Sequence, residues 1–479
     1  MQDGGIQVFK RRLAEQKQRD AREWSAIVAS AVVPREPQVR RPPPPPSPIL
    51  HERKSGQVES LNTWCHVVDD GSPGLVFSGT AHQKVRICFV GAADIVNPQL
   101  NTLAPNPQAP WTEVGSANQG NDDVHDMWHI YAHGCHWVSW CSGGKTGMYN
   151  NASGQWEVQE GDTKQWVAQV THDGQGTFTV QRVHQIKPDL DHSQPGATWR
   201  LSEANDSYIV PLAGGFAVST RAPGTWGSGV MFVHFAVDPQ KGPYDADYAR
   251  YAGVVTFVGG HGISSSKATD AGGVGYLIDA GNLGPVNEII GPASLGFGNP
   301  LGGDLRRFLL QAPLLSMGTL LTAQVLIKAD NYVSPPGTHG GETPWHLAMP
   351  TAITLDKTWS SPYSPGPSEV PGAWILLTYR AIPTDNSSPF DDQGYIHRRC
   401  YYISDWKNAW EMAWSQNVRA PADQGGHGLV GTRNRPHTLR WDYDGQHFVV
   451  TVYSNVKAGP NGGTAENGCW YILEDLSWP

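Results

Sequence analysis

From about residue 60 onward, the chain repeats one local pattern: a short run of β-branched and aromatic residues, a turn of Gly or Asp, and a second such run. Residues 164–185 show it clearly, with the turn at Asp173 and Gly174. Similar hairpins surround Gly214-Gly215 and Asp444-Gly445. Asp-Gly and Gly-Gly between β-rich runs are strong signals of antiparallel hairpins. The pattern therefore predicts an all-β body.

The composition agrees with this prediction. Hydrophobic residues make up 39% and charged residues 16% of the chain, which also has 54 Gly and 37 Pro. This mixture suits short strands joined by tight turns rather than a helical protein. Two segments nevertheless show a helical period, residues 304–317 and residues 403–416. We expect these two segments to form the few helices of the body.

Residues 1–55 differ in character from the rest of the chain. The pattern predicts an amphipathic helix at residues 1–33, a Pro-rich extended linker at residues 34–55 and the β-rich body at residues 56–479. A helix of this length buries little surface against itself and needs a partner to be stable. We expect it to dock onto another protein, and a disordered tail is the alternative. The apolar docking residues are Ile6, Phe9, Leu13, Trp24, Ile27 and Val28.

The net charge of −9 conceals an asymmetry between these parts. Residues 1–55 hold 11 Lys+Arg and 6 Asp+Glu, a net charge of +5. The rest of the chain holds 24 Lys+Arg (35 − 11) and 38 Asp+Glu (44 − 6), a net charge of −14. An acidic body argues against nucleic-acid binding there, because phosphate contacts need clustered Lys and Arg. The sequence contains no apolar run of ~18 residues, so we expect no membrane insertion. It also shows no secretory signal.

Two hairpins of the body resemble each other. The segments at residues 171–180 and 442–451 both place Asp-Gly-Gln shortly before a Phe and a β-branched strand. Recurrent hairpins of this kind suit a β-propeller, which at ~45 residues per blade would have six or seven blades here. A β-sandwich or a two-domain β protein is the alternative. The hairpin residues are Asp173, Gly174, Phe178, Asp444, Gly445 and Phe448.

The first of these hairpins resembles the Asp-box of sialidase-type propellers, whose pattern is Ser/Thr-x-Asp-x-Gly-x-Thr-Trp/Phe. Thr171, Asp173, Thr177 and Phe178 match it, and Gln175 stands at the glycine position. With the partial copies at residues 442–451 and 151–158, the resemblance covers about thirty residues and implies the propeller fold. In that family the Asp-box lies away from the active site. No motif places the arginine triad, Tyr nucleophile and Glu of a sialidase, so the catalytic residues are unknown.

The layout of helix, Pro-rich arm and β-rich body resembles virion decoration or adsorption proteins of tailed bacteriophages. The resemblance implies a structural protein made in the host cytoplasm and located in the virion. Residues 1–55 would bind other proteins of the assembly, and the propeller would present a surface for host attachment through a partner or a glycan. The alternatives are a polysaccharide-acting propeller enzyme, either a glycoside hydrolase or a lyase, and a lectin-like module whose exposed aromatic residues stack on sugars.

The densest group of titratable residues includes His125, Asp126, His129 and His133. On a helix, histidines four residues apart would share one face and could bind a metal. Gly134 and the β-rich residues after it favour a strand instead, with His129 and His133 on one face. We therefore expect a ligand-binding surface at these four residues, with no metal and no cofactor.

The six cysteines show no CxxC spacing, which argues against a structural zinc site. Their even number permits disulfides without requiring them. We expect buried free thiols, and disulfides are the alternative.

Overall fold

The computed structural model describes most strands of the body and part of its connecting segments. The described residues are 44–81, 84–105, 111–116, 124–142, 148–150, 155–157, 164–186, 208–212, 215–221, 229–238, 240–245, 248–258, 276–277, 286–293, 304–311, 320–327, 345–355, 373–383, 395–403, 411–418, 436–458 and 464–479. The chain divides into two compact units, Met1–Pro45 and Pro46–Pro479. The predicted helix at residues 1–33 and its docking residues Ile6, Phe9, Leu13, Trp24, Ile27 and Val28 lie outside the described residues.

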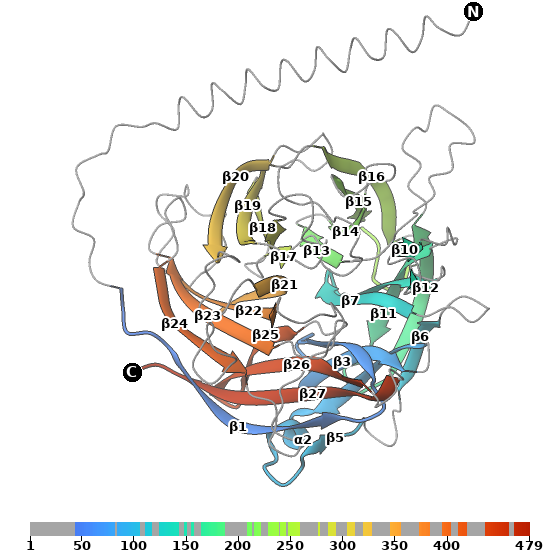
Figure 1. Ribbon diagram of the computed structural model, residues 1–479. Coiled ribbons are helices and arrows are strands. Elements are labelled where there is room, and N and C mark those ends of the chain that lie inside the picture. Colours follow the sequence, from blue (N-terminus) through green and yellow to red (C-terminus); the bar gives the residue numbers. More distant parts are fainter. Residues whose placement is uncertain are drawn as a thin grey trace, which may run out of the picture. The chain divides into compact units, whose positions relative to one another are not determined.

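The second unit is a β-propeller, and its described strands form six antiparallel blades (Figure 1). Blade 1 consists of β2 (Thr63–Val68), β3 (Gly74–Ala81), β4 (Lys84–Gly91) and β6 (Thr112–Ser116). Blade 2 consists of β7 (Val124–Ala132), β8 (Cys135–Ser142), β11 (Lys164–His172) and β12 (Phe178–Ile186). Blade 3 consists of β13 (Tyr208–Leu212), β14 (Gly215–Arg221), β15 (Gly229–Val237) and β16 (Ala249–Val258).

The other three blades follow in chain order. Blade 4 consists of β17 (Tyr276–Leu277), β18 (Val286–Ala293), β19 (Asp304–Gln311) and β20 (Leu320–Ile327). Blade 5 consists of β21 (Trp345–Thr354), β22 (Ala373–Pro383), β23 (Tyr395–Ile403) and β24 (Glu411–Val418). Blade 6 consists of β25 (His437–Tyr443), β26 (Gln446–Ala458), β27 (Thr464–Ser477), β1 (Ile49–Val58) and the short parallel strand β5 (Thr102–Leu103). The pair β9 (Met148–Asn150) and β10 (Gln155–Glu157) and the short helix α2 (Ala92–Val96) complete the described elements.

The first strands of the blades form the inner ring. Contacts run from β2 to β7, β13, β17, β21 and β25 in turn, and β25 contacts β2 again. Each blade then adds its antiparallel strands outward, as Figure 1 shows. Because the inner strands run in the same sense, the β2–β3, β7–β8, β11–β12 and β25–β26 turns lie at one end of the propeller.

The ring is closed by the two ends of the body. Strand β1 pairs antiparallel with β27 from Ile49 to Val58, so blade 6 contains strands from both ends. Residues 49–55, which we assigned to the Pro-rich linker, are therefore part of the body. A disulfide between Cys65 and Cys469 links β2 of blade 1 to β27 of blade 6. The described cysteines Cys88, Cys135 and Cys400 are buried free thiols.

The core lies between neighbouring blades, because alternate residues of a strand point to opposite faces. In β8, Trp137 packs in the cluster that joins blade 2 to blade 3, whereas Val138 and Trp140 pack against blade 1. In β3, Phe77 packs toward blade 6 and Val76 toward blade 2. Strands buried on both faces read as nearly continuous apolar runs, and every residue of β3 is buried.

The two segments with a helical period form strands where the structure describes them. Residues 304–311 are β19, which pairs with β18 and β20, and residues 411–418 are β24, which pairs with β23. The helix prediction was wrong because short apolar runs do not distinguish a helix from a strand without their partners. Ladder pairing with neighbouring strands decides the outcome. Among the described residues, no helix is both long and apolar enough to cross a membrane.

A prediction follows from the closure of the ring. A protein of residues 46–479 should unfold cooperatively at the same temperature as the full chain, because the second unit includes β1. A protein of residues 59–479 lacks β1, exposes the edge of β27 and should lose the cooperative transition. Circular dichroism during heating measures both. Cooperative unfolding of residues 59–479 at an unchanged temperature would contradict the role given to β1.

A second prediction concerns the junction of blades 5 and 6. The guanidinium of Arg398 in β23 makes two contacts with the carboxylate of Glu474 in β27, and the two side chains are only 5% and 4% exposed. Glu474→Gln should lower the free energy of unfolding by about 3–5 kcal/mol, because it leaves a buried cation without its counter-ion. Urea unfolding measures this loss.

The exposed pair of Lys84 and Glu113 provides the control, since its side chains are 44% and 46% exposed. Glu113→Gln should cost at most about 1 kcal/mol. Equal losses in the two variants would show that the buried pair contributes nothing beyond a surface ion pair.

Candidate functional site

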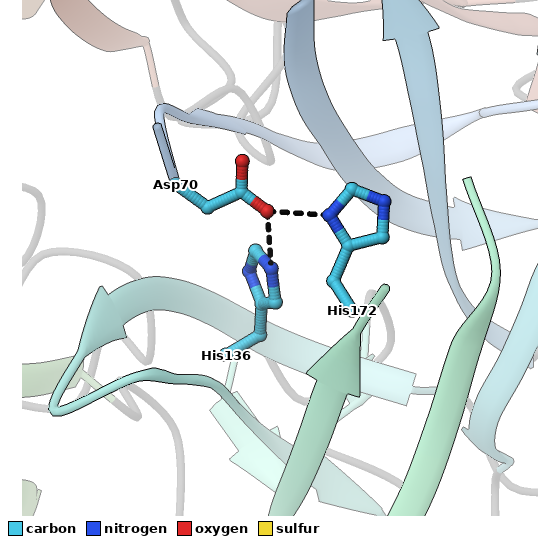
Figure 2. Close-up of side chains that lie close together, drawn as sticks. All are labelled: Asp70, His136 and His172. Carbon is cyan, nitrogen blue, oxygen red and sulfur yellow. Dashed lines mark hydrogen bonds and ion pairs between the residues drawn. The ribbon is translucent and has the colours of Figure 1, made fainter. Parts of the chain in front are cut away.

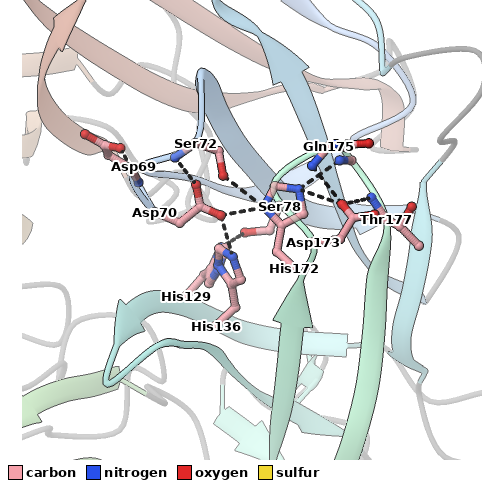
Figure 3. A network of polar contacts seen from close by, with 12 residues as sticks. Asp69, Asp70, Ser72, Ser78, His129, His136, His172, Asp173, Gln175 and Thr177 are labelled. Atoms are coloured by element: carbon pink, nitrogen blue, oxygen red, sulfur yellow. Dashed lines mark hydrogen bonds and ion pairs between the residues drawn. The ribbon is translucent and has the colours of Figure 1, made fainter. Parts of the chain in front are cut away.

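Five polar side chains form a continuous buried chain between blades 1 and 2, which we call the histidine–aspartate chain (Figures 2 and 3). Its members, in order of contact, are Ser78, His129, His136, Asp70 and His172. Ser78 lies in β3 and Asp70 in the β2–β3 turn, both of blade 1. The three histidines come from β7, β8 and the end of β11 in blade 2. The chain therefore crosses the seam between the two blades at both ends.

The contacts are short and consecutive. Ser78 Oγ lies 2.8 Å from His129 Nδ1, and His129 Nε2 lies 3.0 Å from His136 Nδ1. Asp70 Oδ2 lies 3.1 Å from His136 Nε2 and 2.5 Å from His172 Nδ1. One carboxylate oxygen thus serves two imidazoles, as Figure 2 shows.

Two turns hold the ends of this arrangement. In the β2–β3 turn, Ser72 N–H donates to the second carboxylate oxygen of Asp70 at 3.0 Å. In the β11–β12 turn, Asp173 Oδ1 accepts from the N–H of Gln175 and of Thr177 at 2.7 and 3.0 Å. This side-chain turn directs Gly176 N–H onto His172 Nε2, 3.0 Å away.

These donors fix the tautomer of every imidazole. Gly176 N–H donates to His172 Nε2, so the proton of neutral His172 is on Nδ1 and is donated to Asp70. His136 must donate to the carboxylate from Nε2, so its Nδ1 accepts from His129 Nε2–H. His129 Nδ1 is then an acceptor for the hydroxyl of Ser78. The proton on His172 Nδ1 also lies near Ser72 Oγ, 3.4 Å from that nitrogen. Each imidazole nitrogen of the chain therefore has a partner, and the chain is satisfied without any further ligand.

The chain is closed to solvent. The side chains of Asp70, His136 and His172 are 3%, 0% and 2% exposed. Burial by itself would raise the pKa of Asp70, but the hydrogen bonds from His136 and His172 and from Ser72 N–H outweigh it and hold that pKa well below its ordinary value. Burial lowers the pKa of His129 and of His136. These directions agree on one protonation state for these three groups, with Asp70 ionised and His129 and His136 neutral.

Asp70, His136 and His172 are also the group of described residues whose ligand atoms lie close enough to hold a metal ion. Two ligands of a tetrahedral zinc ion are about 3.3 Å apart, given bonds of 2.0–2.1 Å. Asp70 Oδ2 and His172 Nδ1 are closer than that, at 2.5 Å. Ligation through His172 Nδ1 would also move its proton to Nε2, where Gly176 N–H already points. The arrangement fits a shared hydrogen-bonded carboxylate and does not fit a metal ion.

The ligand surface predicted at four residues does not form as one surface. His129 is 1% exposed and belongs to the histidine–aspartate chain, so its assignment to a surface was wrong. His133 lies in the β7–β8 turn, where φ is 54° and Nε2 donates to the carbonyl of Gly215 in blade 3 at 2.8 Å. His125 and Asp126 are in β7, at an irregularity in its pairing with β8, and their side chains lie outside the described residues.

The residues of the two Asp-Gly hairpins lie in and beside tight turns. Asp444 and Gly445 form a two-residue turn with φ of 50° and 71°, as the turns that suit strand twist require. Phe448 is fully buried between blades 6 and 1. In the first hairpin, Gly174 has φ of 80°, and the ring of Phe178 stacks on His172 with centroids 4.3 Å apart.

Sequence reasoning missed the partners of His129. No sequence pattern joined Asp70 to His136 or His172, which lie 66 and 102 residues away. The available signal was local: His172 directly precedes the Asp-box aspartate. The meeting of these side chains is a property of the seam between blades 1 and 2.

A second candidate site is an open surface pocket beside blade 6, which we call the blade-6 pocket, with a volume of about 290 Å³. Arg53 of β1 forms one wall and the β25–β26 turn another. The segment at the end of α2 supplies the apolar part. The lining residues are Arg53, Val96, Pro98, Tyr443, Asp444 and Gln446.

No family model and no curated protein matches the sequence. Solved structures do match in shape. They include a sialidase of Trypanosoma rangeli in complex with an inhibitor (10% identity, TM-score 0.40), which covers 89% of this chain, and this chain spans 59% of the sialidase. The match to an exo-1,5-α-L-arabinanase from a bovine ruminal metagenomic library (12% identity, TM-score 0.31) spans 75% of this chain and 96% of the arabinanase chain.

The match to a β-1,2-mannobiose phosphorylase of Listeria innocua (11% identity, TM-score 0.37) spans 74% of this chain and 91% of the phosphorylase chain. The sialidase structures are of the type that the hairpin at residues 171–178 resembles. At these identities and scores the likeness carries no argument about activity. The order of the sheets, rather than these scores, carries the propeller fold.

A prediction tests the role of the shared carboxylate. Asp70→Asn keeps the shape of the side chain, but its NH2 group must face either Ser72 N–H or the two imidazole N–H groups. Donors then face donors in a buried site, and the free energy of unfolding should fall by about 3 kcal/mol. Chemical unfolding at pH 7.5 measures the loss.

The neighbouring residue gives a matched control. Asp69 is exposed, and its Oδ1 accepts from Gly71 N–H at 2.8 Å, a contact that asparagine keeps. Asp69→Asn should change stability by less than about 0.5 kcal/mol. Similar small effects in the two variants would show that the carboxylate of Asp70 does not hold the seam.

Proposed function

We propose that this chain is a carbohydrate-binding β-propeller, and that the blade-6 pocket is a site where it binds a sugar. The observation that carries the proposal is the pre-formed combination of an anchored arginine, an amide and a half-buried tyrosine around one small hollow. Carbohydrate sites join an aromatic surface to a few fixed polar groups.

Arg53 is held in place before any ligand arrives. Its Nη1 donates to Gln446 Oε1 at 2.9 Å, and its Nε lies 3.4 Å from Asp475 Oδ1. The guanidinium also lies over the ring of Phe448, 5.1 Å from its centroid. A fixed donor costs less entropy to bind a ligand than a free side chain does.

The tyrosine and the amide complete the hollow. Tyr443 is half-buried and stacks on Trp441 with ring centroids 5.2 Å apart and an angle of 12° between the rings. Gln446 uses its amide oxygen on Arg53, and its NH2 group supplies a donor. Asp444 adds an exposed carboxylate at the turn.

Size and charge support a small neutral sugar. The volume of about 290 Å³ lies at the lower end of the range of small-molecule pockets and suits one or two sugar residues. The positive charge of Arg53 is already balanced by Asp475. A second anion in the pocket would also meet Asp444, so a neutral hydroxyl-rich ligand fits better than an acidic one.

The described residues support ligand binding better than catalysis. The densest titratable group, the histidine–aspartate chain, is buried and its hydrogen bonds are complete, so a substrate does not reach it. Beside the blade-6 pocket, Asp442 is engaged by Arg440 and His447, at 3.2 and 2.5 Å. A polysaccharide-cleaving activity remains the alternative, and release of sugar from glycans incubated with the protein would establish it.

The N-terminal segment extends this proposal. Residues 1–45 form a compact unit of their own, and their apolar docking residues and basic charge suit a docking segment. We propose that they attach the propeller to a larger assembly, a virion or a similar structure. Pull-down of the partner by the full chain but not by residues 46–479, with equal glycan binding by both, would support this tether.

A prediction for the blade-6 pocket uses the repeated Asp-Gly-Gln turn. A glycan array first identifies a sugar ligand, and calorimetry then compares Gln446→Ala with Gln175→Ala, the glutamine that follows Asp-Gly between β11 and β12. Gln446→Ala should weaken binding about fivefold to tenfold, the effect of losing one hydrogen bond. Gln175→Ala should leave binding unchanged. Absence of any glycan ligand for the full chain, or equal effects of the two variants, would refute the pocket.

A further inference from the structure

The histidine–aspartate chain has a property that the proposed binding function does not use. It is a polar connection between blades 1 and 2, with Ser78 and Asp70 from one blade and three imidazoles from the other. Buried apolar side chains also line this seam, including Val76, Val138 and Phe178. Charge placed on the imidazoles would therefore have no water to stabilise it.

None of the three imidazoles has room for a second proton. The acceptor nitrogen of His172 faces Gly176 N–H at 3.0 Å, and that of His136 faces His129 Nε2 at 3.0 Å. The acceptor nitrogen of His129 receives the hydroxyl of Ser78 at 2.8 Å. Protonation at any of these nitrogens sets two donors against each other or requires the serine hydroxyl to turn away.

The surrounding groups offset this only in part, because Asp70 raises the pKa of His129 and of His136 but burial outweighs it. His66 of β2 and His437 of β25 lie near His129, and a proton on either would repel one on His129. On the other side, His172 Nε2 is 3.9 Å from the exposed carboxylate of Asp173. The ring of Tyr131 lies 5.0 Å from that of His136. Asp70 is the buried anion of the group, and its one shared oxygen already accepts from two imidazoles.

We propose that the histidine–aspartate chain is an acid-sensitive lock on the seam between blades 1 and 2. At neutral pH the chain is complete and the seam is closed. In acid His129 and His136 take up protons only when the seam opens, which separates the turn at residues 69–73 from the hairpin at residues 172–178. The proposal is independent of the blade-6 pocket.

The direction follows from proton binding. In an open seam the histidines meet water and bind protons as pH falls below about 6.5. In the closed seam the pKa of His129 and of His136 is lowered, first by burial, so the closed form binds fewer protons. Acid therefore favours the open form. Each proton bound only by the open form raises the open-to-closed ratio by up to about tenfold per pH unit.

Hydrogen exchange followed by mass spectrometry tests the lock in the full chain. Exchange of peptides that cover residues 69–78 and 172–178 is measured at pH 7.5 and pH 5.5 and corrected for the intrinsic effect of pH. These peptides should exchange at least about tenfold faster at pH 5.5, the effect of one or more protons. Peptides of β27 in blade 6, a strand without histidine, should change little. Unchanged exchange at the seam, or the same increase in β27, would overturn the proposal.

Variants separate titration from general weakening. His129→Gln keeps one donor and one acceptor but cannot take up a proton, so it should reduce the pH effect at the seam by about tenfold for the proton removed. His51→Gln, at an exposed histidine of β1, should keep the full pH effect. An undiminished pH effect in His129→Gln would refute the lock.

If His129→Gln does not fold, a spectroscopic measurement on the unaltered chain still tests the proposal. Nitrogen NMR of ¹⁵N-histidine at pH 7.5 should show one buried imidazole protonated on Nδ1, as assigned to His172, and two protonated on Nε2, as assigned to His129 and His136. Charged imidazoles at these positions at pH 7.5 would overturn the proposal.

Discussion

The pairing of β1 with β27 is the interaction on which the rest of the propeller depends. It places residues 49–58 beside residues 469–477, so a single blade contains both ends of the body. The disulfide between Cys65 and Cys469 ties the same blade to blade 1. The other described seams join blades that follow one another along the chain. Among the described blades, the seam between blades 6 and 1 alone is closed by residues about 400 positions apart.

Once the ring is closed, each described blade presents two faces, and apolar side chains fill the seams. Two polar contacts stand out against that background. Arg398 and Glu474 pair across blades 5 and 6, and the histidine–aspartate chain crosses blades 1 and 2. Buried polar groups of this kind stabilise little by themselves, but each is costly to disrupt because its partners are left unpaired. They therefore favour one arrangement of neighbouring blades over sliding alternatives.

The two Asp-Gly-Gln turns show how surroundings divide roles between similar sequences. At Asp173 the turn lies against the seam between blades 1 and 2. It directs Gly176 N–H onto His172, whose ring stacks on Phe178. At Asp444 the turn lies beside β1 and α2, and Gln446 meets Arg53 at an open hollow. The turn itself is local, whereas the choice between a seam and a pocket depends on which elements pack against it.

The all-β class and the hairpin turns could be predicted from the sequence alone, because Gly and Asp at positive φ and the aromatic residues after them act within a few residues of chain. The sequence did not determine β19 or β24, which read as helical until their partner strands were known. It also did not place β1 in the last blade or join Asp70 to His136 and His172. These features depend on contacts between residues far apart in the chain, and only the tertiary structure brings such residues together.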